Sequence, residues 1–241
     1  MNTNVTPEVE SDSFGGPKLP GLPADNERFA VTEVRLGRRP FVRELLETVV
    51  LTLLIFLAVR TVVQNFVVEG TSMEPTLHSA QMLFVNKAAY YQWDTRFFER
   101  LNPLGGGAAV PAQMTYLLGA PQRGDIIVLH APNDYLQRDF IKRVIGLPEE
   151  RVQVRAGDGV YINGLKLAEP YIQDPPDYNW PPEGTETAVP ANQLFVLGDN
   201  RRNSDDSHVF GFIQQSAVVG RAWFIYWPRE SLGPLPHPTY K

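Results

Sequence analysis

The sequence contains no cysteine, which excludes disulfide scaffolds, zinc-thiolate sites, iron–sulfur clusters and cysteine nucleophiles. Histidine is scarce: the four histidines are scattered and show neither HxxxH nor HExxH spacing, which argues against a histidine-rich metal site. The 22 basic residues are outnumbered by 27 acidic ones, and this balance gives no indication of nucleic-acid binding. Hydroxyl groups therefore remain as the candidate nucleophiles.

What the sequence does contain points to a folded chain rich in turns. Its 241 residues are 43% hydrophobic, enough to build a sizeable core in one domain or two small ones. The 19 glycines and 21 prolines favour turns and strands over long helices. Residues 1–34 are polar and lack apolar periodicity, and we expect them to be disordered.

A hydrophobic stretch follows a cluster of arginines. Its uncharged part, residues 48–59, is shorter than the ~20 residues that a membrane-spanning helix needs. Extension to Phe66 supplies the length and includes Arg60, which can reach the lipid headgroups from the end of a helix. A soluble core helix is an alternative, but the stretch is hydrophobic on all sides. A cleaved signal peptide is another, but Ala58-Val59-Arg60 is not a small-x-small cleavage site.

We therefore predict one uncleaved transmembrane helix over residues 44–66. Four arginines flank its N-terminal side, namely Arg35, Arg38, Arg39 and Arg43. By the positive-inside rule, the basic tail 1–43 is expected in the cytoplasm and residues 67–241 outside.

The region after this helix has the pattern of a mostly β domain. Short β-prone runs are Phe66–Val68, Met82–Val85, Asp125–His130, Phe140–Ile145, Val152–Val154, Val160–Ile162, Leu194–Leu197 and Ala222–Trp227. Asn163-Gly164 between two alternating runs predicts a two-residue hairpin. Residues 88–122 resemble an insertion with the aromatic residues Tyr90, Tyr91, Trp93, Phe97 and Phe98. These rings either lie at the bilayer interface or form a satellite cluster on the sheet.

Ser72 is the first candidate nucleophile, because Gly70 and Pro75 bracket it in a segment that cannot be regular helix. A serine hydroxyl needs a base, and no serine–histidine partnership is evident. Among the five lysines, Lys142 stands out because it shares a strand face with Phe140 and Val144, whereas Arg143 points the other way. Desolvation there would lower the pKa of Lys142 and let a neutral amine take the serine proton. The strand taken alone favours the other interpretation, a lysine on an edge strand whose amine reaches solvent.

A polar run, Gly198–Gly211, follows the apolar strand Leu194–Leu197. Taken alone it is a surface turn, a calcium loop or a network that supports a site. The EF-hand glycine and terminal glutamate are absent, which disfavours calcium.

Together these segments resemble the bacterial type I signal peptidases, the membrane-bound Ser–Lys endopeptidases of the S26 family. The matching blocks are the apolar helix, Gly70–Leu77, Met82–Lys87, Arg123–Val128, Asp139–Pro148, Gly198–Gly211 and Gly220–Pro228. The resemblance implies a signal-peptidase-like β-rich catalytic domain, with Ser72 as the acylating nucleophile and Lys142 as the general base. The Ser72 N–H would contribute to the oxyanion hole.

The resemblance also assigns supporting residues. Met73 would flank the substrate cleft, Ser204 would orient the lysine, and Asp206 would support the site. Asp199 and Arg201 would hold the polar loop in shape.

Two positions depart from the family pattern. Gly70 stands where some members have a hydroxyl that donates to the oxyanion, so another donor must substitute. His208 stands where the family usually has arginine, which would make an ion pair there sensitive to pH.

The function that the resemblance implies is removal of N-terminal signal peptides from exported preproteins at Ala-x-Ala-like sites. The implied partners are secretory preproteins and membrane phospholipid, with no metal, cofactor or nucleic acid, and the implied location is the bacterial plasma membrane. A Ser–Lys self-cleaving repressor peptidase is disfavoured, because such repressors carry an N-terminal DNA-binding domain. A non-catalytic membrane-tethered β domain that binds exported proteins is the remaining alternative.

Overall fold

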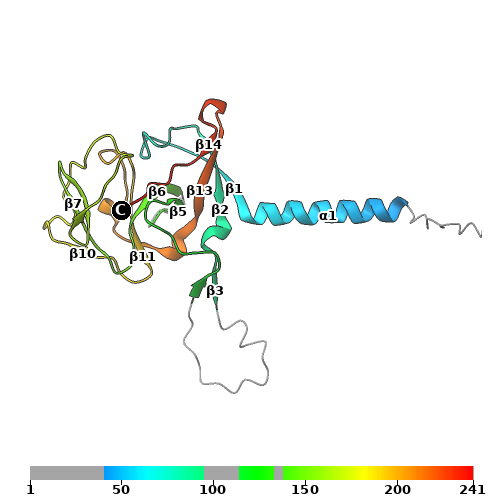
Figure 1. The fold of residues 1–241 in the computed structure, drawn as a ribbon, viewed down its shortest axis with the longest axis horizontal. Coiled ribbons are helices and arrows are strands. Elements are labelled where there is room, and N and C mark those ends of the chain that lie inside the picture. The colour runs from blue at the N-terminus through cyan, green and yellow to red at the C-terminus, as the bar shows by residue number, and fades with distance from the viewer. Residues whose placement is uncertain (1–40, 95–113, 133–137, 241) are drawn as a thin grey trace, which may run out of the picture. The chain divides into compact units, whose positions relative to one another are not determined.

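A computed structural model describes residues 41–94, 114–132 and 138–240 of the chain (Figure 1). Its elements in chain order are α1 (Phe41–Val62), β1 (Val63–Val67), β2 (Met82–Asn86), η1 (Lys87–Tyr90), β3 (Gln92–Asp94), β4 (Met114–Tyr116), β5 (Ile126–His130), β6 (Asp139–Gly146), β7 (Arg151–Arg155), β8 (Gly159–Ile162), β9 (Leu165–Lys166), β10 (Thr187–Ala188), β11 (Gln193–Leu197), α3 (Ser207–Phe210), β12 (Ile213–Gln214), η2 (Gln215–Ala217), β13 (Val218–Trp227), η3 (Arg229–Ser231) and β14 (Gly233–Pro234). Strands dominate, so the predicted mostly β fold is confirmed.

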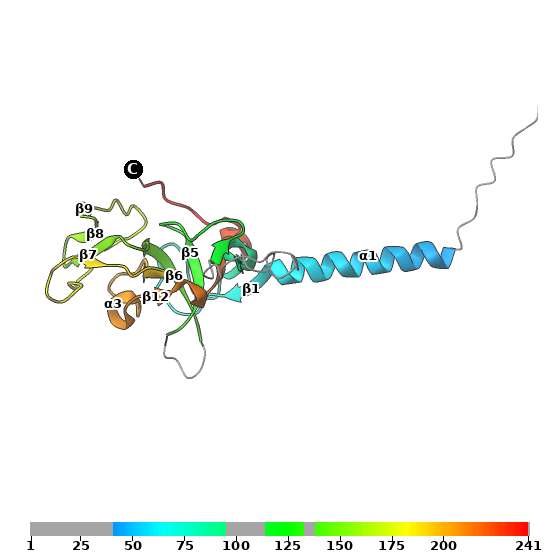
Figure 2. The same cartoon turned by 90° about the horizontal axis from the view of Figure 1, so that it is seen from below.

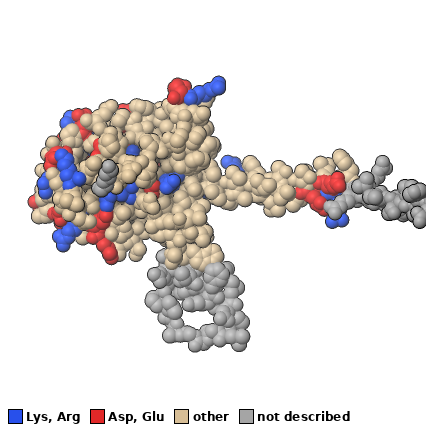
Figure 3. All heavy atoms as spheres, in the orientation of Figure 1, with Lys and Arg blue, Asp and Glu red and all other residues tan. Residues whose placement is uncertain are grey.

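Helix α1 has the length and composition of a membrane span. Its 22 residues extend about 33 Å at ~1.5 Å per residue, close to the ~30 Å of a hydrocarbon core. Its charged residues lie near the two ends, and its middle is free of charge (Figure 3). Thr52 Oγ1 donates to the Thr48 carbonyl at 2.7 Å, which satisfies a hydroxyl that lipid could not. Within the described ranges, α1 is the one helix that meets the criteria for a membrane span.

The helix lies at slightly different residues from the predicted 44–66. It begins at Phe41 and ends at Val62, and Val63–Val67 form β1 instead. The β-branched Val62 and Val63 favour a strand at this point, and β1 finds an antiparallel partner in β2, where Val63 faces Asn86.

The main sheet holds the candidate catalytic segments. Its strands follow the order β1-β2-β13-β5-β6-β11-β12, with β14 beside β13 (Figures 1 and 2). Alternate residues of β5 serve opposite faces: Ile126 and Val128 pack in one core cluster, and Ile127 and Leu129 in another. The central strands are therefore buried on both sides, which fixes their register.

A second sheet with the order β10-β7-β8-β9 packs its own core cluster. Asn163 and Gly164 join β8 to β9 with φ values of 52° and 79°, the left-handed geometry of a type I′ turn. The hairpin that the Asn-Gly pair predicts is therefore confirmed.

The described part of the 88–122 segment includes the short antiparallel ribbon of β3 and β4. The Tyr90 hydroxyl donates to Asp125 Oδ2 at 2.7 Å, so this aromatic residue is tied to the main sheet. Tyr91 is 54% exposed, and its placement at a bilayer interface stays a prediction. Phe97 and Phe98 lie outside the described residues.

Candidate active site

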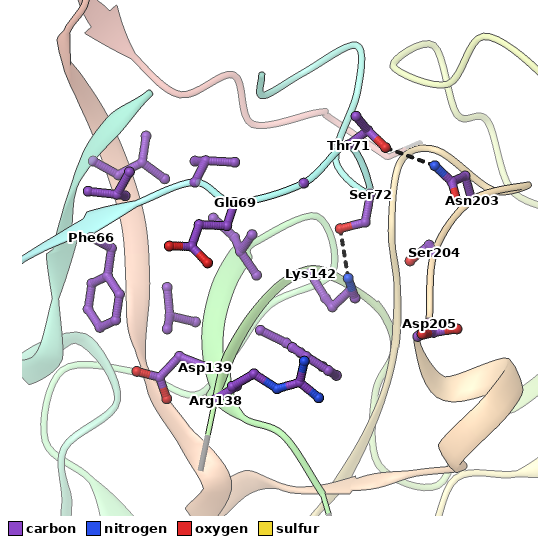
Figure 4. A pocket seen from close by; sticks show the side chains of 17 residues that line it. Phe66, Glu69, Thr71, Ser72, Arg138, Asp139, Lys142, Asn203, Ser204 and Asp205 are labelled. Atoms are coloured by element: carbon purple, nitrogen blue, oxygen red, sulfur yellow. Dashed lines mark hydrogen bonds between the residues drawn. The ribbon is translucent and has the colours of Figure 1, made fainter. Parts of the chain in front are cut away.

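The segment after β1 presents Ser72 from a turn whose neighbours are buried. Val68, Met73 and Leu77 are at most 4% exposed and pack in one core cluster, whereas Ser72 stays half-buried. Gly70 has φ +82°, a left-handed conformation that glycine adopts without strain. Burial on both sides of Ser72 holds its hydroxyl toward a cleft (Figure 4).

Lys142 approaches Ser72 from β6. Its Nζ lies 2.8 Å from Ser72 Oγ and 5.4 Å from the centre of the Phe140 ring (Figure 4). Lys142 is 4% exposed, and this burial lowers the pKa of its amine. The negative charges of Asp206, Asp205 and Asp199 oppose that effect in decreasing order. The net lowering favours the neutral amine, the form that can accept a proton from Ser72.

Arg143 points away from Lys142, as strand alternation predicts. Its guanidinium donates two hydrogen bonds to the Asp199 carboxylate, from Nε to Oδ1 at 2.8 Å and from Nη2 to Oδ2 at 2.6 Å. Both side chains are 0% exposed. Arg143 Nη1 also donates to the Gly124 carbonyl at 2.9 Å. This bidentate pair ties β6, the strand that carries Lys142, to the start of the polar loop 198–206.

The loop 198–206 supports the turn that carries Ser72 through hydrogen bonds. The Asn200 N–H donates to the Ser72 carbonyl at 3.0 Å, and Asn203 Nδ2 donates to Thr71 Oγ1 at 2.8 Å. Gly198 leaves no room for a side chain, since an added Cβ would lie 2.6 Å from Ser204 Cβ and closer still to Ser204 Oγ and the Ser72 carbonyl. Among the interpretations of this run, the structure favours a supporting network.

Arg201 anchors the same loop to a distant segment. Its Nη1 and Nη2 donate to Glu169 at 2.8 and 2.6 Å, and its Nε donates to the Gly198 carbonyl at 3.0 Å. Glu169 was not singled out by the sequence analysis, because it lies in a proline-containing segment with no apolar periodicity. No pattern in the sequence marks Glu169 as the partner of Arg201.

Ser204 and Asp206 occupy different parts of the site. Ser204 lines the cleft beside Lys142, and its buried Oγ has no hydrogen-bond partner among the described residues. Its expected contact with the lysine therefore stays a prediction. Asp206 is fully buried and accepts from the Gly198 N–H at 2.8 Å and from the His208 N–H at 3.2 Å.

His208 extends this network. Its Nδ1 lies 2.7 Å from Asp206 Oδ1, and its ring stacks on Tyr178 with centroids 3.9 Å apart. A titratable ring therefore touches a carboxylate whose charge acts on Lys142.

The cleft in front of these residues has a volume of about 690 Å³. Its floor includes the apolar Leu83, Val128 and Ile141. Met73, predicted to flank the cleft, packs its side chain in the core at 1% exposure, and its part in substrate binding stays a prediction.

Within the described ranges, no three His, Asp or Glu side chains gather in a way that could hold a metal ion.

The pairing of a serine hydroxyl with a buried amine beside this cleft suits nucleophilic attack on a carbonyl. The Ser72 N–H has no acceptor among the described residues, so it is free to donate to a developing oxyanion. Gly70 supplies no side-chain hydroxyl, and a second donor is left unassigned.

Comparisons with known proteins relate the chain to one family of peptidases. The sequence profile of the family described as "Signal peptidase, peptidase S26" matches residues 42–227. Signal peptidase I of Leptolyngbya laminosa is 38% identical over 239 residues, which cover 96% of this chain and 98% of that protein. Signal peptidase I of Bacillus caldolyticus is 37% identical over 177 residues, or 69% and 81% of the two chains. A crystal structure of a signal peptidase I from Enterococcus faecalis is 38% identical, covers 43% of this chain and 97% of its own, and has a TM-score of 0.36.

Proposed function

Because the chain belongs to the signal peptidase family S26, we propose that it removes N-terminal signal peptides from exported preproteins with a Ser72–Lys142 dyad. One observation carries the assignment of the dyad: the Lys142 Nζ lies 2.8 Å from Ser72 Oγ inside a desolvated site. That distance is within hydrogen-bond reach, as proton transfer requires.

In the proposed acylation, neutral Lys142 takes the Ser72 proton as Oγ attacks the scissile carbonyl carbon. The resulting ammonium then protonates the leaving amine, and the signal peptide remains bound as an ester of Ser72. A water molecule, activated by the same amine, hydrolyses this ester and restores the enzyme. The Ser72 N–H stabilises the oxyanion in both tetrahedral intermediates, a contribution of about 3 kcal/mol per donor.

The substrate is proposed to bind as an extended strand in the cleft. Residues 139–142 of β6 pair with β5 along one edge, and β11 joins the other edge only from Arg143 onward. Across the cleft, residues 68–72 form the facing wall (Figure 4). An extended peptide inserted between them would add main-chain hydrogen bonds to the open edge. The apolar floor then suits apolar side chains such as alanine at the first and third positions before the cut.

Helix α1 is proposed as the single anchor in the bacterial plasma membrane. The arginines before the helix favour a cytoplasmic tail over residues 1–43, and the peptidase domain 67–241 would then lie outside. Membrane phospholipid is accordingly a proposed partner along with secretory preproteins. Tethering raises the effective concentration of enzyme where translocated cleavage sites emerge.

The test is cleavage of a purified preprotein with an Ala-x-Ala site by the full chain in detergent with phospholipid. Cleavage after the second alanine, mapped by mass spectrometry and abolished by Ser72→Ala, is the expected result. Equal cleavage by the Ser72→Ala variant would exclude Ser72 as the nucleophile. No cleavage by either folded form would favour a tethered binding domain without catalytic activity.

A further inference from the structure

Tyr171 lies behind the catalytic loop and contacts neither the cleft nor the dyad. Its ring stacks on the guanidinium of Arg143, with Arg143 Cζ 4.0 Å from the ring centroid. Arg143 is the residue that grips Asp199 with two hydrogen bonds. Stacking of a planar guanidinium on an aromatic face restricts its orientation and adds a cation–π attraction. The ring of Tyr171 therefore controls the first of the two buried arginines that hold the loop.

The hydroxyl of Tyr171 acts on the second arginine. It donates to Glu169 Oε1 at 2.8 Å, and the same carboxylate receives Arg201 Nη2 at 2.6 Å and Nη1 at 2.8 Å. Glu169 is 3% exposed in its side chain and Arg201 is 0% exposed, so water does not compete for these bonds. Arg201 in turn bonds the Gly198 carbonyl.

Tyr240, near the C-terminus, completes a short series of hydrogen bonds that runs from Tyr240 through Tyr171 to Glu169. Tyr240 and Tyr171 lie with their hydroxyl oxygens 3.0 Å apart. A tyrosine has one proton to donate, and Tyr171 gives its proton to Glu169, so Tyr240 is the donor and Tyr171 the acceptor. Burial, followed by the charge of Glu169, raises the pKa of Tyr171 and keeps the hydroxyl protonated.

We propose that Tyr171, completed by Tyr240, is a positioning residue for the catalytic reaction: it holds Arg143 with its ring and Glu169–Arg201 with its hydroxyl. Both arms end on the segment Gly198–Arg201, which bonds the Ser72 carbonyl. The inference rests on the proposed peptidase function. Tyr171 lines a separate cavity of about 600 Å³ together with Pro75 and Arg143, so it acts on the dyad without touching substrate.

Two substitutions distinguish the ring contact with Arg143 from the hydroxyl contact with Glu169. For each, kcat and KM are measured in the full-length chain with a preprotein substrate. Tyr171→Phe keeps the stack and loses the hydroxyl, and we expect kcat to fall about tenfold, the factor that one hydrogen bond to a charged group represents, with KM unchanged. Tyr171→Leu loses both arms, and we expect kcat to fall about a hundredfold, the cost of a misplaced catalytic group, again with KM unchanged.

The pH dependence distinguishes positioning from general destabilisation. In Tyr171→Leu, Arg143 holds Asp199 less firmly, and the less neutralised carboxylate raises the pKa of Lys142. The acidic limb of the pH profile of kcat/KM is the range in which activity rises as the neutral base forms. It should move to higher pH in Tyr171→Leu and stay in place in Tyr171→Phe. Tyr240→Phe should lower kcat, and adding it to Tyr171→Phe should cost nothing more, because the two hydroxyls act in series.

Tyr161 provides a matched control. Its ring stacks under Arg155 at 3.8 Å, and its hydroxyl donates to Asp158 Oδ2 at 2.6 Å, in the second sheet and outside the catalytic loop. Tyr161→Phe and Tyr161→Leu should keep wild-type kcat and limb position. Wild-type kcat in Tyr171→Phe, or equal losses in the Tyr161 variants, would overturn the inference. If the wild type and Ser72→Ala cleave alike, the proposed function itself has failed.

Discussion

Substituting Gly198 by alanine tests whether the loop 198–206 is packed without spare room against Ser72, the proposed nucleophile. Ordinary contact begins near 3.4 Å, and the new Cβ would lie 2.6 Å from Ser204 Cβ, a shortfall of about 0.8 Å. Ser204 Oγ and the Ser72 carbonyl would be closer still, so either the loop or the nucleophile turn shifts by nearly 1 Å. A displacement of that size at catalytic groups costs about 10²-fold in rate, or ~2.7 kcal/mol of transition-state stabilisation.

The assay is preprotein cleavage with kcat and KM determined separately, accompanied by thermal unfolding of the same samples. Overpacking of this kind typically lowers the free energy of unfolding by ~1–3 kcal/mol, so the variant should remain folded at assay temperature. Gly233→Ala is the control, because a Cβ there meets nothing within 4 Å. An activity of Gly198→Ala within threefold of wild type would refute the argument that the loop position limits catalysis.

Three further substitutions probe the charges around the site. Asp205→Asn removes a charge that raises the pKa of Lys142, so the acidic limb of the kcat/KM profile, along which the neutral base forms, should move to lower pH. Arg143→Met leaves Asp199 buried without its cation and should lower the free energy of unfolding by about 3–5 kcal/mol in urea titrations, much of which Asp199→Leu should restore. His208→Arg should retain activity, because a guanidinium can keep the contact with Asp206 that the His208 ring makes at 2.7 Å.

Surface residues supply the controls for these three. Asp174 is 62% exposed in its side chain, and Asp174→Asn should leave the pH profile unchanged. Arg155→Met should alter the free energy of unfolding by less than about 0.5 kcal/mol, as is usual at exposed positions. An unmoved acidic limb in Asp205→Asn, a loss below about 1 kcal/mol in Arg143→Met, or a loss of activity in His208→Arg would each contradict the corresponding reasoning.

Local patterns in the sequence predicted much of the framework. Alternation along residues 139–146 separated Lys142 from Arg143, because successive side chains of a strand face opposite sides. The Asn163-Gly164 pair predicted its hairpin through the left-handed conformation that both residues adopt. The residue at which helix α1 ends could not be predicted in this way. Val63–Phe66 suits a helix or a strand, and only pairing with β2 decides between them.

Pairings between distant residues could not be predicted in the same way. Arg143 meets Asp199 across 56 positions, and Arg201 meets Glu169 across 32. The chain has 27 acidic residues, and no periodicity marks which of them faces a given arginine. Tyr171 went unnoticed for the same reason, because its ring meets Arg143 from a different part of the chain and its hydroxyl meets the carboxylate that Arg201 also binds.

The buried charges around the loop are better explained by geometry than by stability. Ion pairs such as Arg143–Asp199 and Arg201–Glu169 gain little net stability, because desolvation offsets most of the attraction. Replacing a pair by apolar residues would therefore leave the fold standing, but it would remove the fixed directions that bidentate contacts impose. The role proposed for Lys142 needs such directions, because its amine can serve as a base only while it remains both desolvated and 2.8 Å from Ser72 Oγ. An Arg143→Met/Asp199→Leu double variant that is stable yet poorly active would separate the two roles, whereas full activity would assign the Arg143–Asp199 pair to folding alone.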